Sequence, residues 1–364
     1  MRTGKSIVEL AKELERQQNS KRDFVADTRA IELDRDGQTL KLSGNGAIHE
    51  ASIDGQGGFK VNTHCHSQIG DRIGIPRKYY QRMLSEAPVL LSTNVNYWMR
   101  HNPEERMLRT LDGRARAFLS RRYRTLDNYD IGVAALEKIS DAGCQVMTSE
   151  LTDLRMYIQA VNFKVEGEVK KGDIVKAGII VSNSEVGAGA VKIEPLIYRL
   201  ACLNGMVMPD YSLKKYHVGR NKKGMELTED AAAEFFRDET RKADDKAFFM
   251  KVQDLVAAAL EQTKFEKIIE RLRDAHEQKI ESTDLTKVVE VTQKKLQLSE
   301  GEKNNVLSFL IQGGDLSKWG LANAVTATAN EHEDYDRAVE LERAGGMVIE
   351  LPQTDWKEIS TAAA

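Results

Sequence analysis

The sequence predicts an α+β protein, in which an antiparallel sheet with helices on one face is followed by a mostly α-helical C-terminal region. Two Asp-Gly pairs, beginning at Asp36 and Asp112, each separate short segments of alternating apolar and polar residues, the pattern of a β-hairpin. Four strand-like segments follow one another between residues 145 and 200. After Pro209 the chain has one further proline, Pro352, and is rich in Ala, Glu, Lys and Leu, which favours helices.

The N-terminal part alternates helices with strands. Pro76 suits the first turn of a helix, and Asp127 suits the cap of another. The expected elements are a helix over residues 6–16, a hairpin over 29–43, helices over 66–72 and 76–84, a hairpin over 107–120, a helix over 127–139, and strands over 145–150, 155–163, 174–182 and 190–200.

The C-terminal part has helical periodicity. Apolar residues recur at helical spacing over 248–259 and, with shifted phase, over 265–272, which predicts an amphipathic helix or a helix pair. Further helices are expected over 321–330 and 335–343. The last should end at Gly345-Gly346 with a left-handed cap, followed by a short closing strand or tail. We place the boundary between an α+β domain (1–225) and a helical domain (226–364) near residue 226.

Composition narrows the class of protein. The 364 residues are 41% hydrophobic and 30% charged, as in a globular protein of two or three domains. Three widely spaced cysteines, Cys65, Cys144 and Cys202, argue against a disulfide framework and for a reducing compartment. No apolar run is long enough to span a membrane, and charges interrupt the N-terminal helix throughout. We therefore expect a cytoplasmic protein.

Charge is distributed unevenly along the chain. Residues 71–125 contain twelve basic and five acidic side chains, whereas residues 226–290 contain eleven basic and seventeen acidic ones. A locally positive segment in a chain of net charge −3 predicts a surface that meets a polyanion.

The most basic part of this segment predicts a nucleic-acid-binding strand. Alternation places Arg114, Arg116 and Arg122 on one open face, with apolar residues such as Ala117 on the other. Beside them Tyr123 offers a ring for stacking on a base. Alternatively, this is a solvated face with ion pairs to the acidic helical part.

A second basic segment, residues 214–223, lies between Pro209 and Gly224 and predicts a loop that closes over a phosphate backbone. The alternative is a solubilising linker. The complete set of predicted nucleic-acid-binding residues is Arg100, Arg109, Arg114, Arg116, Arg121, Arg122, Tyr123, Arg124, Lys214, Lys215, Arg220, Lys222 and Lys223.

Four segments of the chain contain combinations of residues that helix or strand periodicity alone does not explain. They are residues 75–80 (IPRKYY), 199–205 (RLACLNG), 216–220 (YHVGR) and 319–325 (WGLANAV). In this order they resemble the phage- and plasmid-related family called domain of unknown function number 932, with Ala201 where the family usually has Val. The resemblance covers residues from about 60 to 350. It implies a protein of mobile elements, whose members often occur near recombination and replication genes.

Other candidate sites have weaker support. His64 and His66 would share one side of a strand and could bind a metal, although a structural role is favoured. Cys202 has no identifiable catalytic partner. The acidic segment 331–336 fits a helix start better than a cation site. The segment 219–224 lacks the Lys and Ser/Thr of a phosphate-binding loop, and Gly187-Ala188-Gly189 predicts a turn between strands.

These observations favour a DNA-binding protein of phage recombination or replication that prefers single strands and forms homo-oligomers. Annealing of complementary strands would follow if the oligomers hold the backbone and leave the base edges free. The mechanism is electrostatic capture with base stacking, without catalysis, cofactor or metal, in the cytoplasm of a bacterial host. Two alternatives stay open: an interaction protein that sequesters a host factor, and an unrecognised metal-dependent nuclease.

Overall fold

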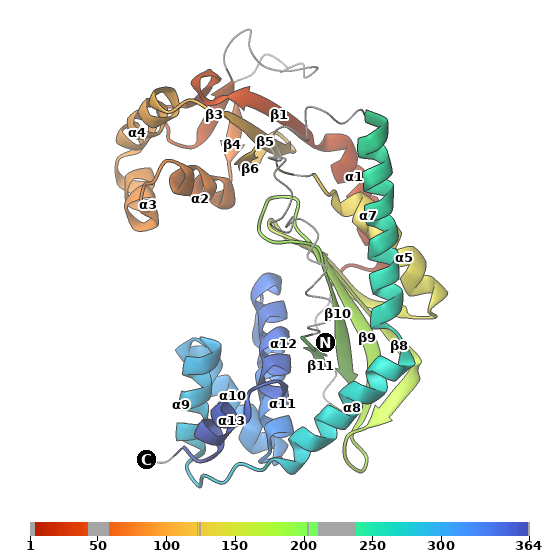
Figure 1. Cartoon of the computed structure of the whole chain (residues 1–364). Coiled ribbons are helices and arrows are strands. Elements are labelled where there is room, and N and C mark those ends of the chain that lie inside the picture. Colours follow the sequence, from red (N-terminus) through yellow and green to blue (C-terminus); the bar gives the residue numbers. More distant parts are fainter. Residues whose placement is uncertain are drawn as a thin grey trace, which may run out of the picture.

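The computed structural model describes residues 4–42, 58–121, 123, 125–201, 204–209 and 238–362. Within these residues the chain forms two β-sheets and a set of helices (Figure 1). One sheet lies at one end of the molecule, the second in the middle, and the C-terminal helices at the opposite end. The predicted α+β class, with mostly antiparallel strands before a helical C-terminal region, is confirmed.

The first sheet contains six described strands in the spatial order β1-β5-β6-β4-β3-β2. Neighbours are antiparallel except β4 and β6, which are parallel. Both predicted hairpins are present, and Asp112 and Gly113 have φ of 51° and 70°, as a two-residue type I′ turn requires. The strands are β1 (Arg22–Asp27), β2 (Ile31–Leu33), β3 (Thr39–Leu42), β4 (Phe59–Val61), β5 (Glu105–Leu111) and β6 (Arg114–Ser120).

Three helices cover one face of this sheet: α2 (Thr63–Arg72), α3 (Arg77–Glu86) and α4 (Pro88–His101). The first two agree with the predicted helices, whereas α4 was not predicted. Pro88 occupies its first position, where the fixed φ of proline suits a helix start. Leu33 and Leu108 of the sheet pack in one buried cluster with side chains of all three helices.

The second sheet is antiparallel throughout its five described strands, in the order β11-β10-β9-β8-β7. The four predicted strands are confirmed, and β11 adds a fifth. The strands are β7 (Gln145–Leu151), β8 (Met156–Glu168), β9 (Ile174–Asn183), β10 (Lys192–Arg199) and β11 (Asn204–Val207). Gly187-Ala188-Gly189 lies in the turn between β9 and β10, as predicted.

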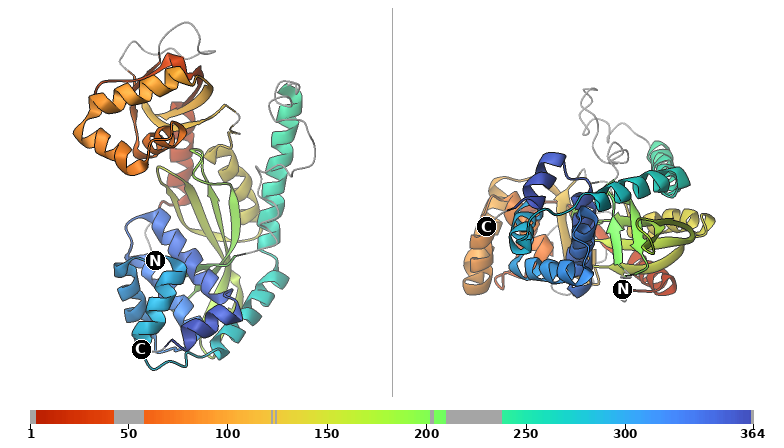
Figure 2. Two further views of the ribbon diagram at one scale, coloured as in Figure 1. Left: turned by 60° about the vertical axis from the view of Figure 1, so that its left-hand side comes forward. Right: turned by 90° about the horizontal axis from the view of Figure 1, so that it is seen from below.

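Helices cover both faces of the second sheet, so the expectation of helices on one face is wrong for this sheet. Alternate residues of β8 show this, because Ile158 packs with α1, α5 and α7, whereas Tyr157 packs with Tyr335 of α12. Figure 2 shows α1, α5 and α7 beside the sheet. Their bounds are α1 (Ile7–Ser20), α5 (Asn128–Asp141) and α7 (Asp238–Ala259).

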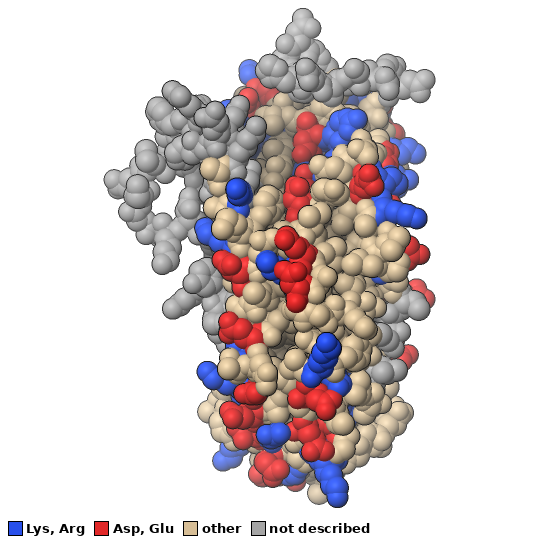
Figure 3. Space-filling model, turned by 90° about the vertical axis from the view of Figure 1, so that its right-hand side faces the viewer, with Lys and Arg blue, Asp and Glu red and all other residues tan. Residues whose placement is uncertain are grey.

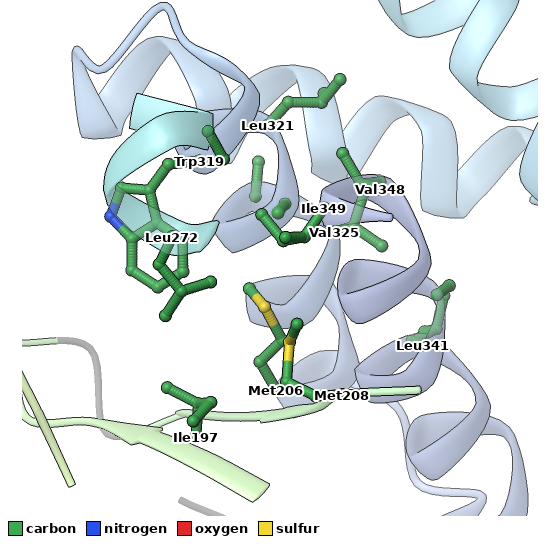
Figure 4. Close-up of a cluster of buried hydrophobic side chains, with 14 of the residues drawn as sticks. Ile197, Met206, Met208, Leu272, Trp319, Leu321, Val325, Leu341, Val348 and Ile349 are labelled. Atoms are coloured by element: carbon green, nitrogen blue, oxygen red, sulfur yellow. The ribbon is translucent and has the colours of Figure 1, made fainter. Parts of the chain in front are cut away.

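The remaining helices form the C-terminal end: α8 (Gln262–Glu277), α9 (Leu285–Leu296), α10 (Glu300–Gly313), α11 (Lys318–Thr328), α12 (Tyr335–Ile349) and α13 (Gln353–Ser360). They share a core with the sheet: Ile197 and Met206 of β10 and β11 pack in one cluster with Leu272, Trp319 and Val325 (Figure 4). Two short 3₁₀ helices, Thr28–Ala30 and Ala329–Glu331, complete the described elements.

Two expectations for the C-terminal end are wrong. Gly345-Gly346 does not end a helix, because α12 continues to Ile349. A Cβ on Gly346 would lie 2.0 Å from the carbonyl oxygen of Val207, so the glycines permit close packing rather than a cap. The expected closing strand is replaced by α13. The predicted boundary near residue 226 lies outside the described residues.

No helix in the described part of the chain combines the length and the apolar character needed to span a bilayer.

Candidate nucleic-acid interface

The predicted row of arginines on β6 is interrupted by a β-bulge. Arg109 pairs with Ala117 and Thr110 with Ala115, so Arg116 is the additional residue. Ala115 and Ala117, which would share a face in a regular strand, consequently lie in different buried clusters. The Arg116 side chain keeps only 11% of its surface exposed, and that of Arg109 none. The expectation that Arg116 lies on an open face is wrong, and Arg109, also predicted to bind nucleic acid, is fully buried.

Arg109 is held by acceptors from three parts of the chain. Its guanidinium donates to the carboxylate of Asp23 at 2.9 Å, to that of Asp127 at 2.8 Å and to the backbone carbonyl of Glu185 at 2.9 Å. Lys21 forms a second ion pair with Asp127. Burial alone would raise the pKa of Asp127, but hydrogen bonds from Arg109 and Lys21 outweigh it and lower that pKa below its ordinary value.

Arg116 belongs to the same network through Glu185, which is 5% exposed on the turn between β9 and β10. The Glu185 carboxylate accepts from Arg116 Nη2 at 2.5 Å and from the backbone N–H of Asn128, at the start of α5, at 2.6 Å. The first sheet, α5 and the second sheet therefore meet at one carboxylate. We call Arg109, Arg116, Asp127 and Glu185 the buried clamp.

Tyr123 also contacts the turn between β9 and β10. Its hydroxyl donates to the carbonyl of Ser184 at 2.9 Å, and its half-buried ring packs with Leu119 and Val186. Burial raises the pKa of the Tyr123 hydroxyl. A ring in this position supports the junction of the two sheets and is not free to stack on a base.

The other predicted residues are exposed or lie outside the described part. Arg114 is exposed, Arg121 is exposed and paired with Glu105, and Arg100 is 57% exposed with a Glu32 oxygen at 3.5 Å. The predicted residues that lie outside the described part are Arg122, Arg124, Lys214, Lys215, Arg220, Lys222 and Lys223.

Other basic side chains of residues 71–125 also form ion pairs with acidic side chains, which neutralise part of the positive charge of the segment. Arg72 and Arg106 both pair with Glu104, and Arg82 pairs with Glu86. Basic and acidic side chains are also interspersed on the face formed by α1, α5 and α7 (Figure 3). The excess of basic residues in the sequence thus overstates the cations available to a polyanion.

An unpredicted group of aromatic side chains lies on the outer side of α4. Tyr97 and Trp98 are 56% and 40% exposed, although rings of this size are usually more buried. The Tyr97 and His101 rings are stacked, with their centroids 5.3 Å apart and an angle of 12° between the ring planes. The Trp98 ring contacts both of them edge-on. We call Tyr97, Trp98 and His101 the α4 aromatic cluster.

A shallow groove of about 740 Å³ runs beside this cluster. We call it the α4 groove, and its lining is Glu32, Arg35, Val89, Ser92, Thr93, Asn96, Tyr97, Arg100 and His101. Arg35 is exposed, and its side chain forms no ion pair with another described residue. The groove therefore combines two exposed guanidinium groups with two stacked rings. The sequence Tyr97-Trp98-Met99-Arg100-His101 contains both rings and one of the two arginines, and this is the signal in the sequence that indicates the groove.

The two histidines considered as metal ligands lie in α2, not in a strand, so that part of the expectation is wrong. His64 Nε2 lies 2.9 Å from the carbonyl oxygen of Val186, and His66 Nδ1 lies 3.0 Å from the Tyr80 hydroxyl. Across the described ranges, no three His, Cys, Asp or Glu side chains gather to hold a metal ion. Cys202 lies outside those ranges.

The acidic segment before α12 has a structural role. The Asp334 carboxylate accepts from the backbone N–H groups of Asp336 at 2.9 Å and Arg337 at 3.3 Å, which caps the helix. His332 contacts Glu302 at 3.1 Å. The segment thus satisfies backbone donors at the helix start, in agreement with the simpler of its two interpretations.

The fold defines an α+β protein in which two sheets are joined by the buried clamp. Residues 117–346 match the family model described as "Domain of unknown function (DUF932)". Because this match covers more than half of the chain, the chain belongs to that family, as predicted from the sequence. Three of the four sequence segments lie within the match, whereas residues 75–80 lie outside it. Searches of curated proteins and of solved structures find no match.

Proposed function

We propose that this protein binds single-stranded DNA in the α4 groove. The observation that carries the proposal is the pair of stacked, exposed rings, Tyr97 and His101, next to Arg100. Aromatic platforms beside cations bind single strands because every base has a face for stacking and every nucleotide has a phosphate. In a duplex the bases are already stacked on one another, so the aromatic cluster favours unpaired strands.

The arrangement assigns separate roles to the side chains of the groove. The stacked rings of Tyr97 and His101 offer their faces to bases, while Arg35 and Arg100 contact phosphates. Glu32, which lies near Arg100, would give way to a phosphate, because an exposed ion pair contributes little stability. We further propose that the protein acts in the cytoplasm of a bacterial host in recombination or replication, and that homo-oligomers holding the backbone anneal complementary strands.

Replacing the central ring tests this proposal. Tyr97→Ala should weaken binding of a labelled single strand about tenfold, because stacking on one aromatic side chain contributes about 1–3 kcal/mol. Fluorescence anisotropy with single and double strands, at low and high salt, measures the change. Tyr129→Ala on α5 is the matched control, since Tyr129 is a tyrosine with 38% exposure outside the groove.

Three results would contradict the proposal. These are no binding of single strands at low salt, equal binding of duplexes, and unchanged affinity in Tyr97→Ala. Binding of a protein partner that depends on Tyr97 but hardly on salt would instead identify the groove as a protein interface. The exposed Val89 and Leu90 beside it would then supply apolar contact area.

A further inference from the structure

A second pocket, separate from the α4 groove, opens between α2, α3 and β4. Its volume is about 240 Å³, and Val61, Ile75 and Leu84 give it apolar walls. Gly70 also lines it, next to the Tyr80 ring, and a Cβ at Gly70 would lie 2.9 Å from that ring. The volume is small compared with the ~300–1,000 Å³ of typical ligand pockets, so it suits one ring system rather than a large ligand.

His66 is a buried polar side chain of this pocket, with 6% of its surface exposed. Its Nδ1 lies 3.0 Å from the Tyr80 hydroxyl, and the two rings meet edge-on at 5.7 Å. Nε2 has no hydrogen-bond partner among the described residues. Burial lowers the pKa of His66 to about 4, so the imidazole is neutral at pH 7 and Nε2 offers one donor or one acceptor.

The rim of the pocket carries further polar side chains that bind no other described side chain or backbone group. The side chains of Gln38, Asp71, Arg77 and Gln81 line the pocket and are exposed. None of them forms a side-chain hydrogen bond or ion pair with another described residue. A pocket with apolar walls and several unused polar groups is typical of a site for a small ligand.

The chemistry of these groups selects a nucleotide. Amide side chains pair with the mixed donor and acceptor edges of bases, and a neutral imidazole adds a donor or an acceptor. The guanidinium of Arg77 matches a phosphate. We propose that this pocket holds one nucleobase against Ile75 and Leu84, hydrogen-bonded to His66 and Gln81, with the attached phosphate at Arg77. The nucleotide is either free or turned out of a strand.

Titration with single nucleotides tests the pocket. The four deoxynucleoside monophosphates and their nucleosides are added to the full chain, and calorimetry with ligand-observed NMR measures binding. Arg77→Ala should weaken binding of the preferred monophosphate about tenfold and that of its nucleoside about twofold or less, because only the monophosphate offers a charged partner. Lys78→Ala is the matched control, since Lys78 is an exposed neighbour that does not line the pocket.

Ser67→Trp places a large side chain in the pocket and should abolish nucleotide binding while the circular dichroism and melting temperature stay close to those of the native chain. If the pocket holds a nucleotide that belongs to a DNA strand, free nucleotides should show no measurable binding to the native chain. Ser67→Trp should then weaken oligonucleotide binding at least tenfold. If Ser67→Trp folds and changes neither nucleotide nor strand binding, the pocket assignment is wrong. Tyr97→Ala leaves the pocket intact, so its effect on strand binding tests the α4 groove separately.

Discussion

The buried clamp and the α4 groove both contain arginines of the basic segment 71–125, yet they use arginine in opposite ways. Arg109 and Arg116 are buried against carboxylates, whereas Arg35 and Arg100 lie exposed beside aromatic rings. In the clamp the cations hold the two sheets together. In the groove they are available to a ligand.

The difference shows that basic residues in a sequence do not by themselves predict a binding surface. Asp127 and Glu185 lie 18 and 69 residues from the arginines they bind, and neither belongs to the strand that suggested the site. What distinguishes the α4 groove is exposed aromatic area next to the cations. Stability and binding should therefore respond to different arginines.

The largest expected effect is on stability. Arg109→Ala should lower the free energy of unfolding by about 3–5 kcal/mol, because it removes a fully buried guanidinium that donates to three acceptors and leaves Asp127 with Lys21 as its remaining ion-pair partner. Urea unfolding followed by circular dichroism measures the change. Arg114→Ala, at an exposed position on the neighbouring strand, should change the same quantity by less than about 0.5 kcal/mol.

If Arg109→Ala is as stable as Arg114→Ala, the clamp does not hold the two sheets together. If it folds normally and loses strand binding, Arg109 contacts the ligand, and the distinction between clamp and groove fails.

A smaller effect on stability is expected from pH. The pKa of Asp127 is lower in the folded protein than its ordinary value of 3.8, so its ion pairs stabilise the fold fully above that pH. This contribution is lost as the pH falls below 3.8 toward the folded pKa, because the carboxyl group then takes up a proton. Asp127→Asn should therefore be less stable than the native chain at pH 7, and the difference should shrink in urea unfolding below pH 3.8.

A difference between Asp127→Asn and the native chain that stays constant from pH 7 to pH 3 would contradict this account. It would mean that the ionised form of Asp127 is not what the clamp stabilises.

Local patterns predicted much of the fold. The hairpin at Asp112-Gly113 and the strands of the second sheet follow from alternation and turn residues close in sequence. β1 was missed because its partner β5 lies far away in the sequence, as in the pair Arg22 and Thr110. α4 was missed because its Val, Thr and Asn residues have low helix propensity, and its burial against the sheet outweighs that preference.

Two glycines show why local patterns fail elsewhere. Gly345-Gly346 looks like a helix end in the sequence, but the residues that explain it, Val207 and Thr326, lie on other elements. The bulge at Arg116 is another example, since one additional residue moves the following side chains to the opposite face. Contacts between distant segments decide both cases, and they also decide which arginines are buried.

The smallest expected effect separates the cations of the groove from those of the clamp by salt dependence. Each phosphate contact on a single strand contributes about −0.7 to the slope of log affinity against log salt. Arg100→Ala should therefore reduce the slope by about 0.7 and the double variant with Arg35→Ala by about 1.4, with stability within about 0.5 kcal/mol of the native chain. Anisotropy titrations at several salt concentrations measure the slope.

Arg121→Ala is the control, because Arg121 is equally exposed and paired with a glutamate but lies outside the groove. Equal slopes for Arg100→Ala and Arg121→Ala would show that charge acts on the strand from the whole surface rather than through the α4 groove.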